Sequence, residues 1–122
     1  MERIPADEER EQRIHMEIIA DAYGPEEQAI GWYYYLDEHL QFSFLTICIA
    51  RRATSPLRVS DEVEVVGMAP EEECAHEMFV LMPWERETLA VPLSQLEIIH
   101  GDEQTRQAVE DWHYWTARGY QL

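Results

Sequence analysis

Apolar residues recur at helical spacing near the start of the chain. Ile14, Ile18 and Ile19 fall on one side of a helix that spans approximately residues 6–22. The Tyr-Gly-Pro sequence that follows ends this pattern, because glycine and proline are both unfavourable inside a helix. We therefore predict a first helix, and we expect fraying within residues 1–20.

A second amphipathic helix is predicted from Pro25 to about Leu40. Proline suits the first position of a helix, because the N–H that it lacks would have no partner there. Two glutamates follow, and their carboxylates belong near the positive end of the helix dipole. The positions expected to face the core are Ala29, Trp32 or Tyr33, Leu36 and Leu40.

Strand-like segments occupy the middle of the chain. Residues 62–66 alternate between acidic and apolar side chains, which is the period of a half-buried strand. Prolines, a glycine and short polar stretches separate this segment from its neighbours. We predict four or five short strands, at approximately residues 42–52, 62–66, 78–84, 88–92 and 97–99.

A third helix is predicted at the end of the chain. Asp102 suits its N-cap, and the helical pattern continues to about Arg118. Its buried side would contain Val109, Trp112 and either Tyr114 or Trp115. This order of elements predicts an α+β fold: a small SH3-like antiparallel β-barrel or curled sheet, flanked by two N-terminal helices and one C-terminal helix.

Composition narrows the class of protein. The chain has 122 residues, of which 46% are hydrophobic, so we expect residues 1–122 to form a single domain around one core. The sequence contains neither a signal region nor the roughly 20 apolar residues that a membrane helix needs, so we expect a cytoplasmic protein. Cys48 and Cys74 make no disulfide framework, and Cys48 is expected to be buried in a strand.

The charge of the chain indicates its partners. Asp and Glu number 25 against nine basic residues, every one of them Arg, and the net charge is −16. Such a surface repels nucleic acid and anionic membranes, but it attracts cations. We therefore expect a monomer that binds metal ions and neither nucleic acid nor membranes. A surface charged only for solubility is the alternative interpretation.

The first candidate ligands are Asp37 and Glu38, in the last turn of the second predicted helix. No segment has the ligand spacing of an EF-hand, so a calcium site would be of another kind. Carboxylates are unfavourable near the negative end of a helix dipole, and a bound cation would reverse that penalty. The free carbonyl groups of the last turn are further oxygen ligands of the type that Ca²⁺ accepts. A solvated helix end is the other interpretation.

A second acidic group follows Pro70. Glu71, Glu72 and Glu73 are adjacent and Glu77 is close, so their mutual repulsion favours a neutralising cation. The proline also allows an ordinary helical turn at this point. Asp21, just before the break between the first two helices, could fold over either acidic group.

Other chemistry has weaker support. Zinc would need a second group of ligands besides Cys74, His76 and Glu77, and His39 and Cys48 lie far away in the sequence. The sequence has no glycine-rich phosphate loop, no HExxH and no GxSxG, so we expect no enzymatic activity. The aromatic clusters WYYY and DWHYW are typical of core residues.

Four stretches of the chain resemble a known family. They are DAYGPEEQAIGWYYYLDEHLQF, DEVEVVGMAPEEEC, LAVPLSQL and EDWHYWTARGY, which together represent approximately residues 20–120. In these stretches the chain resembles the small acidic calcium-binding proteins of cyanobacteria, a family associated with calcium buffering during heterocyst differentiation. The resemblance implies a calcium binder without EF-hands, with a β-barrel and helices. It also implies that the aspartate after WYYYL, here Asp37, is the principal ligand.

Two functions from different classes remain. The first is a calcium buffer or sensor whose acidic surface concentrates Ca²⁺, with Asp37→Ala expected to weaken binding more than Glu103→Ala. The second is an SH3-like interaction module whose acidic surface meets a basic protein partner. Calcium should raise the melting temperature of the first and leave that of the second unchanged.

Overall fold

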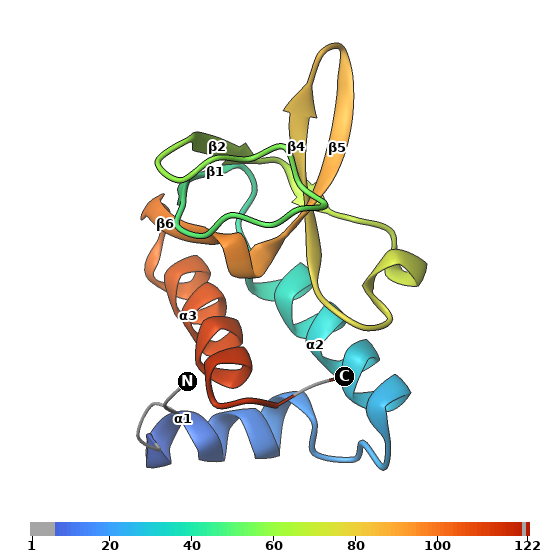
Figure 1. Ribbon diagram of the computed structural model, residues 1–122. Helices are drawn as coiled ribbons and strands as arrows, with labels where there is room; N and C mark the ends of the chain where they lie inside the picture. Colours follow the sequence, from blue (N-terminus) through green and yellow to red (C-terminus); the bar gives the residue numbers. More distant parts are fainter. Residues whose placement is uncertain (1–6, 121) are drawn as a thin grey trace.

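The computed structural model describes residues 7–120 and 122, and within them the chain has an α+β fold. The α-helices are α1 (Glu8–Arg13), α2 (Pro25–His39) and α3 (Glu103–Ala117), and a π-helical turn, η1 (Ile14–Ile18), continues α1. The helices lie in one half of the molecule and the strands in the other (Figure 1). The start of the first predicted helix lies outside the described residues. Its end, predicted near residue 22, is wrong, because η1 ends at Ile18 and the last helical hydrogen bond runs from the Ile19 N–H to the Ile14 carbonyl.

Local sequence signals account for the helix ends. Pro25 begins α2, and the Asp102 carboxylate caps α3 by accepting a hydrogen bond from the Thr105 N–H at 2.7 Å. The Asp7 carboxylate accepts from the Arg10 N–H in the same way and starts α1. The boundaries predicted for α2 and α3 agree with the structure to within a residue.

The strands form two antiparallel sheets of three strands each. One has the order β2-β1-β6, with β1 (Phe44–Cys48), β2 (Glu62–Val65) and β6 (Leu96–His100). The other has the order β3-β4-β5, with β3 (Gly67–Met68), β4 (Phe79–Trp84) and β5 (Glu87–Pro92). Two 3₁₀ turns link the strands: η2 (Glu71–Cys74) and η3 (Leu93–Gln95). The sheets do not close into one barrel, so the predicted SH3-like closure is not observed.

An aromatic cluster joins α2 to α3. Trp32 is fully buried, and its ring centroid lies 5.1 Å from that of Trp112 and 5.5 Å from that of Trp115. The prediction left Trp32 or Tyr33 for the buried face of α2, and the structure buries Trp32. Tyr35 is also buried, whereas Tyr34 is 56% exposed, so only part of the WYYY sequence belongs to the core.

A buried ion pair connects the three helices. The side chain of Asp111 on α3 is completely buried. Its carboxylate accepts two hydrogen bonds from Arg13, at 3.0 and 2.7 Å, and one from the Tyr35 hydroxyl at 2.7 Å. These bonds supply the partners that a buried charge requires. They also fix the position of α2, which carries the first candidate ligand.

Candidate functional site

Helix α2 lies beside η2, and both elements carry predicted ligands. The Tyr33 hydroxyl donates a hydrogen bond of 2.7 Å to the carbonyl oxygen of Ala69, two residues before η2 begins. In Figure 1 this short turn stands next to α2. The side chains of Asp37, Glu71 and Glu72 are exposed. Residues separated by more than 30 positions in the sequence therefore share one face of the molecule.

The electrostatics of two tyrosines show that these carboxylates act on the same place. Burial raises the pKa of Tyr33, and the negative charges of Cys74, Asp37, Glu71 and Glu72 raise it further. Hydrogen bonding to Glu71 and its charge raise the pKa of the exposed Tyr34, and the charge of Asp37 adds to the effect. Asp37 is one helical turn after Tyr33 and Tyr34 on α2, and Glu71 of η2 hydrogen-bonds to Tyr34, so both carboxylates border this tyrosine pair.

The end of α2 adds backbone oxygens to this face. Leu40 leaves the helix in an extended conformation, and its N–H bonds to the Leu36 carbonyl. His39 packs its ring against Tyr35 and places Nδ1 2.8 Å from the Tyr35 carbonyl oxygen. The later carbonyl groups of the last turn have no intrahelical partner, and they carry the negative end of the helix dipole.

Glu38 lies at the edge of this face, and Asp21 lies outside it. Consecutive residues of a helix point about 100° apart, and Glu38 faces a small cavity that Glu17 and Ile18 also line. Asp21 is exposed in the connection before Pro25, so nearly the whole length of α2 separates it from Asp37. Tyr34 lines the same cavity, so Glu38 borders this face at its edge, on the side of Tyr34 that faces η1.

The acidic residues after Pro70 also differ from one another in their surroundings. The Glu77 carboxylate forms an ion pair with Arg52 and accepts a hydrogen bond from the Ser94 hydroxyl at 3.1 Å, so its charge is already compensated. Glu73 is exposed on η2. Cys74 is buried, and burial together with the charges of the adjacent glutamates raises the pKa of its thiol.

No three His, Cys, Asp or Glu side chains among residues 7–120 and 122 converge closely enough to hold a metal ion. The arrangement is instead an open acidic surface with oxygen donors from two elements. Carboxylates, carbonyls and hydroxyls are the ligands that hard divalent cations prefer. Exposed side chains can rotate toward an ion, whereas the backbone that carries them is already in place.

Sequence reasoning missed two contributors to this face. Tyr34 had been assigned to the core with the other aromatic residues, although its exposure places its hydroxyl beside Glu71. Glu26 had been explained by the helix dipole alone, but it lines a cavity of about 540 Å³ together with Glu71 and Glu72. No sequence signal links Glu26 to η2, because only the tertiary fold brings them together.

The fold and this surface define a small acidic α+β protein that offers oxygen ligands to a hard cation. The chain belongs to the CcbP family of calcium-binding proteins, because the family model matches residues 12–116. The crystal structure of CcbP from Anabaena is 41% identical, with a TM-score of 0.87 and complete coverage of both chains. A calcium-binding protein solved in its calcium-binding form is 40% identical, with a TM-score of 0.86 and the same coverage.

Comparison with curated protein sequences gave no match. The family identified from the four sequence stretches is thus confirmed, and calcium is the ion that it binds. In the part of the chain that the structure describes, no helix is both long enough and apolar enough to cross a membrane.

Proposed function

We propose that the chain binds Ca²⁺ on the face shared by α2 and η2 and acts as a cytoplasmic calcium buffer or sensor. Asp37 is the principal ligand, and Glu71 and Glu72 complete the anionic surroundings. The observation that carries this proposal is the contact of α2 with η2, held by the 2.7 Å hydrogen bond from the Tyr33 hydroxyl to the Ala69 carbonyl, which brings Asp37 and Glu71 beside the same tyrosine pair. A cation placed there would remove the repulsion between these carboxylates.

The other predicted ligands have smaller roles in this proposal. Glu73 and Glu38 add to the negative field around the ion, and Asp21 contributes only at long range. Glu77 contributes least, because Arg52 already compensates its charge. The chain acts as a monomer, and its surface binds neither nucleic acid nor anionic membranes because it would repel their phosphates.

The expected affinity depends on how many carboxylates the ion gathers. Three or more converging carboxylates give sensor-type sites, with Kd values of about 10⁻⁷ to 10⁻⁵ M, whereas loose acidic surfaces bind at about 10⁻³ M. The exposed side chains must rotate to reach one ion, and this ordering reduces the net binding energy. We therefore expect micromolar rather than nanomolar binding.

A calorimetric calcium titration of chelator-stripped protein tests the proposal, with and without millimolar magnesium. Saturable micromolar binding that persists in magnesium is the expected result. Weak heats that magnesium abolishes would show that the charge serves solubility alone.

Matched variants then locate the ion. Asp37→Ala and Glu71→Gln should each weaken binding about tenfold or more, because each removes a carboxylate close to the ion. Glu103→Ala removes an equal charge from the exposed first turn of α3 and is the control. Equal affinities for the Asp37 and Glu103 variants would exclude this face as the site.

Tyr34 provides an independent optical test. Bound Ca²⁺ would offset the charges that raise its pKa, so tyrosinate should form at lower pH when calcium is present. The calcium-dependent part of the ultraviolet titration should decrease in Tyr34→Phe, where only Tyr33 remains beside these carboxylates, and persist in full in Tyr114→Phe. A calcium effect that is identical in both variants would place the ion elsewhere.

A further inference from the structure

The sheet β2-β1-β6 carries an apolar stripe on the side opposite the core. Phe44, Thr46 and Cys48 of β1 are buried, so the alternate residues Leu45 and Ile47 face outward and are partly exposed. Ile49 continues the stripe beyond β1 and is 43% exposed. Val59 is 58% exposed, and the neighbouring residues Ser60 and Cys48 are joined by a backbone hydrogen bond of 2.9 Å.

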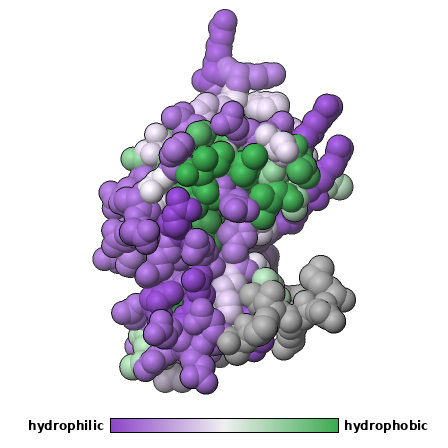
Figure 2. Space-filling view, turned by 90° about the vertical axis from the view of Figure 1, so that its left-hand side faces the viewer, coloured by the Kyte–Doolittle hydropathy of each residue, from purple (hydrophilic) through white to green (hydrophobic). Residues whose placement is uncertain are grey.

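The space-filling view shows the same feature from outside. Strongly apolar side chains gather in the upper half of the face in Figure 2, at the level of β1, β2 and β6 in Figure 1. Polar side chains surround the group on this face. Contiguous apolar surface with a polar rim is typical of interaction sites.

Carboxylates flank the stripe on both sides. Ile47 lies between Glu62 of β2 and Glu97 of β6, and Leu45 lies beside Glu64 of β2. The three glutamates are exposed. Glu62 and Glu97 form no ion pair with any residue in the ranges 7–120 and 122. The outward side of the central strand is thus apolar, and each neighbouring strand presents a carboxylate that forms no ion pair with the described residues.

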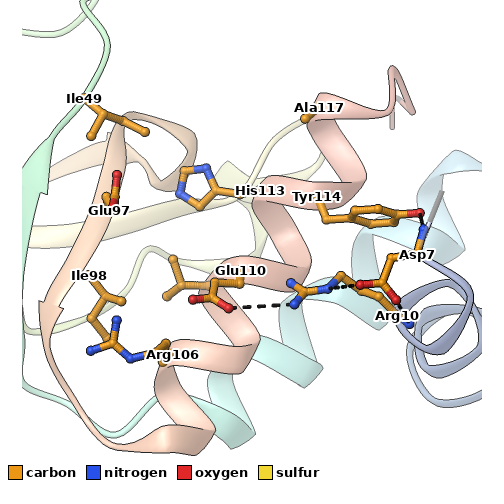
Figure 3. A pocket seen from close by; sticks show the side chains of 11 residues that line it. Asp7, Arg10, Ile49, Glu97, Ile98, Arg106, Glu110, His113, Tyr114 and Ala117 are labelled. Atoms are coloured by element: carbon orange, nitrogen blue, oxygen red, sulfur yellow. Dashed lines mark hydrogen bonds and ion pairs between the residues drawn. The ribbon is translucent and has the colours of Figure 1, made fainter. Parts of the chain in front are cut away.

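A cavity of about 580 Å³ extends this surface toward α3. Figure 3 shows Ile49 and Glu97 on one wall and His113 and Glu110 of α3 on the other. The cavity provides depth next to the end of the apolar stripe. A side chain that follows the stripe past Ile49 can therefore enter it.

We propose that this face, defined by Leu45, Ile47, Ile49, Glu62 and Glu97, docks a basic segment of another protein in which aliphatic residues alternate with Arg or Lys. The aliphatic side chains would pack on the stripe. Neighbouring strands lie about 4.8 Å apart, so carboxylates on the two flanking strands are about 10 Å apart. Alternate residues of an extended segment point to opposite faces, so the Arg and Lys side chains start on the outer side of the segment. Their long stems would fold back around its two edges, and their charged ends would meet the carboxylates on both flanks.

Charge identifies the class of occupant. A second copy of the chain would bring another net charge of −16 against the same face, and an anionic membrane would be repelled in the same way. A basic partner gains electrostatic attraction as well as apolar contact. This surface lies on β1, β2 and β6, whereas the proposed calcium ligands lie on α2 and η2, so the two proposals can fail separately.

The probe is a fluorescein-labelled synthetic peptide in which Arg and Val alternate over about ten residues, the length of a long strand. Fluorescence anisotropy is measured with excess chelator, so that calcium binding does not enter. The comparison peptide has the same composition but all Arg in one block and all Val in another. The alternating peptide should bind at least about tenfold more tightly than the block peptide, since only the former matches the stripe and its flanks.

Charge-matched variants distinguish this site from general attraction to an acidic protein. The double variant Glu62→Gln/Glu97→Gln should weaken peptide binding about tenfold, and Ile49→Ser should weaken it comparably. Glu87→Gln/Glu103→Gln removes the same charge elsewhere, and Ile30→Ser removes an equally exposed isoleucine from α2, so both should change binding less than about twofold.

Amide chemical-shift mapping on the unaltered protein supports or overturns the proposal even if a variant fails to fold. Peptide-induced shifts should concentrate in residues 45–49, 62–64 and 96–100. Equal loss of binding in the two glutamine double variants, equal binding of the two peptides, or shifts centred on α2 would overturn it. Self-association that Ile49→Ser abolishes would identify a second copy as the occupant and would also overturn it.

Discussion

At the scale of single residues, Asp111 shows how tertiary burial changes the role of a carboxylate. Its neighbour Glu110 is exposed, whereas Asp111 is fully buried between α1, α2 and α3. The Asp111 carboxylate raises the pKa of the Arg13 guanidinium, so the guanidinium stays charged. Burial, followed by the hydrogen bond to Asp111, raises the pKa of Tyr35 to about 12, so its hydroxyl remains a donor at neutral pH.

Arg13→Ala should therefore destabilise the fold by about 3 kcal/mol, because it leaves a buried carboxylate without its principal partner. Urea unfolding measures the change in the free energy of unfolding. Arg86→Ala, in the exposed turn between β4 and β5, is the control and should have little effect. Similar values for the two variants would show that Arg10, whose Nη1 lies 3.5 Å from Asp111, can replace Arg13.

His113 should make the stability depend on pH. Burial lowers its pKa, although the hydrogen bond to the Leu96 carbonyl and the charges of Glu97 and Glu110 oppose the shift. The unfolded chain takes up the proton below about pH 6.5, whereas the folded chain does not. Stability should thus be complete above pH 6.5 and fall as the pH decreases toward the folded pKa, by at most about 1.4 kcal/mol per pH unit.

The variant His113→Gln isolates this effect, because glutamine retains an N–H donor for Leu96 but does not titrate. Urea midpoints compared between about pH 7 and pH 5.5 should fall more steeply for the unaltered protein than for the variant. All other carboxylates and histidines are common to both proteins and cancel in the comparison. Parallel pH dependences would contradict a lowered His113 pKa.

At the scale of elements, the position of α2 rests on a close backbone approach. A Cβ atom built on Gly31 would lie 2.3 Å from the carbonyl oxygen of Ile18 in η1. Only glycine leaves enough space for η1 to pack against α2 in this way. The same contact keeps the Asp37 turn in its position relative to the rest of the fold.

Gly31→Ala should destabilise the protein by about 1–3 kcal/mol, the usual cost of overpacking. The sign of this stability change is informative, because alanine normally stabilises a helix interior by about 1 kcal/mol relative to glycine. Gly67→Ala is the control, since its Cβ would meet only a side-chain atom of Leu81 at 3.9 Å. Thermal unfolding that shows Gly31→Ala to be neutral or stabilising would contradict the close contact.

The sequence predicts elements better than it predicts their arrangement. Local signals such as Pro25 and Asp102 predicted where α2 and α3 begin, because capping depends on nearby residues alone. Six strands are present in the described residues instead of four or five, because the chain changes sheets between Val65 and Gly67. Barrel closure depends on that change of sheet, which the alternation of residues 62–66 does not encode.

In the candidate site, too, the sequence predicts individual residues better than it predicts how the fold brings them together. The dipole argument selected Asp37 from its place in a helix, and the family resemblance selected it independently. Whether Glu71 belongs with Asp37 depends on the contact of α2 with η2 and on the Tyr33 hydrogen bond to Ala69, which are tertiary features. The ion pair of Glu77 with Arg52 depends equally on the fold, so no spacing rule could separate Glu77 from its neighbours.

At the scale of the whole molecule, negative charge opposes the compact state. The net charge of −16 produces self-repulsion that any added cation will reduce by screening. A calcium-dependent rise in melting temperature is therefore insufficient evidence of a site. The specific contribution has to be separated from the screening contribution.

Asp37→Asn achieves that separation, because it changes the total charge little while removing the principal proposed ligand. At constant ionic strength, calcium at about 100 times Kd should stabilise the unaltered protein by about 2.7 kcal/mol, and the increase should saturate. Asp37→Asn should lose the saturable part and keep the gradual increase that potassium and magnesium also produce. Glu103→Gln, with the same loss of charge, should keep both parts. If differential scanning calorimetry shows the saturable part intact in Asp37→Asn, calcium stabilises the fold through carboxylates other than those around the end of α2.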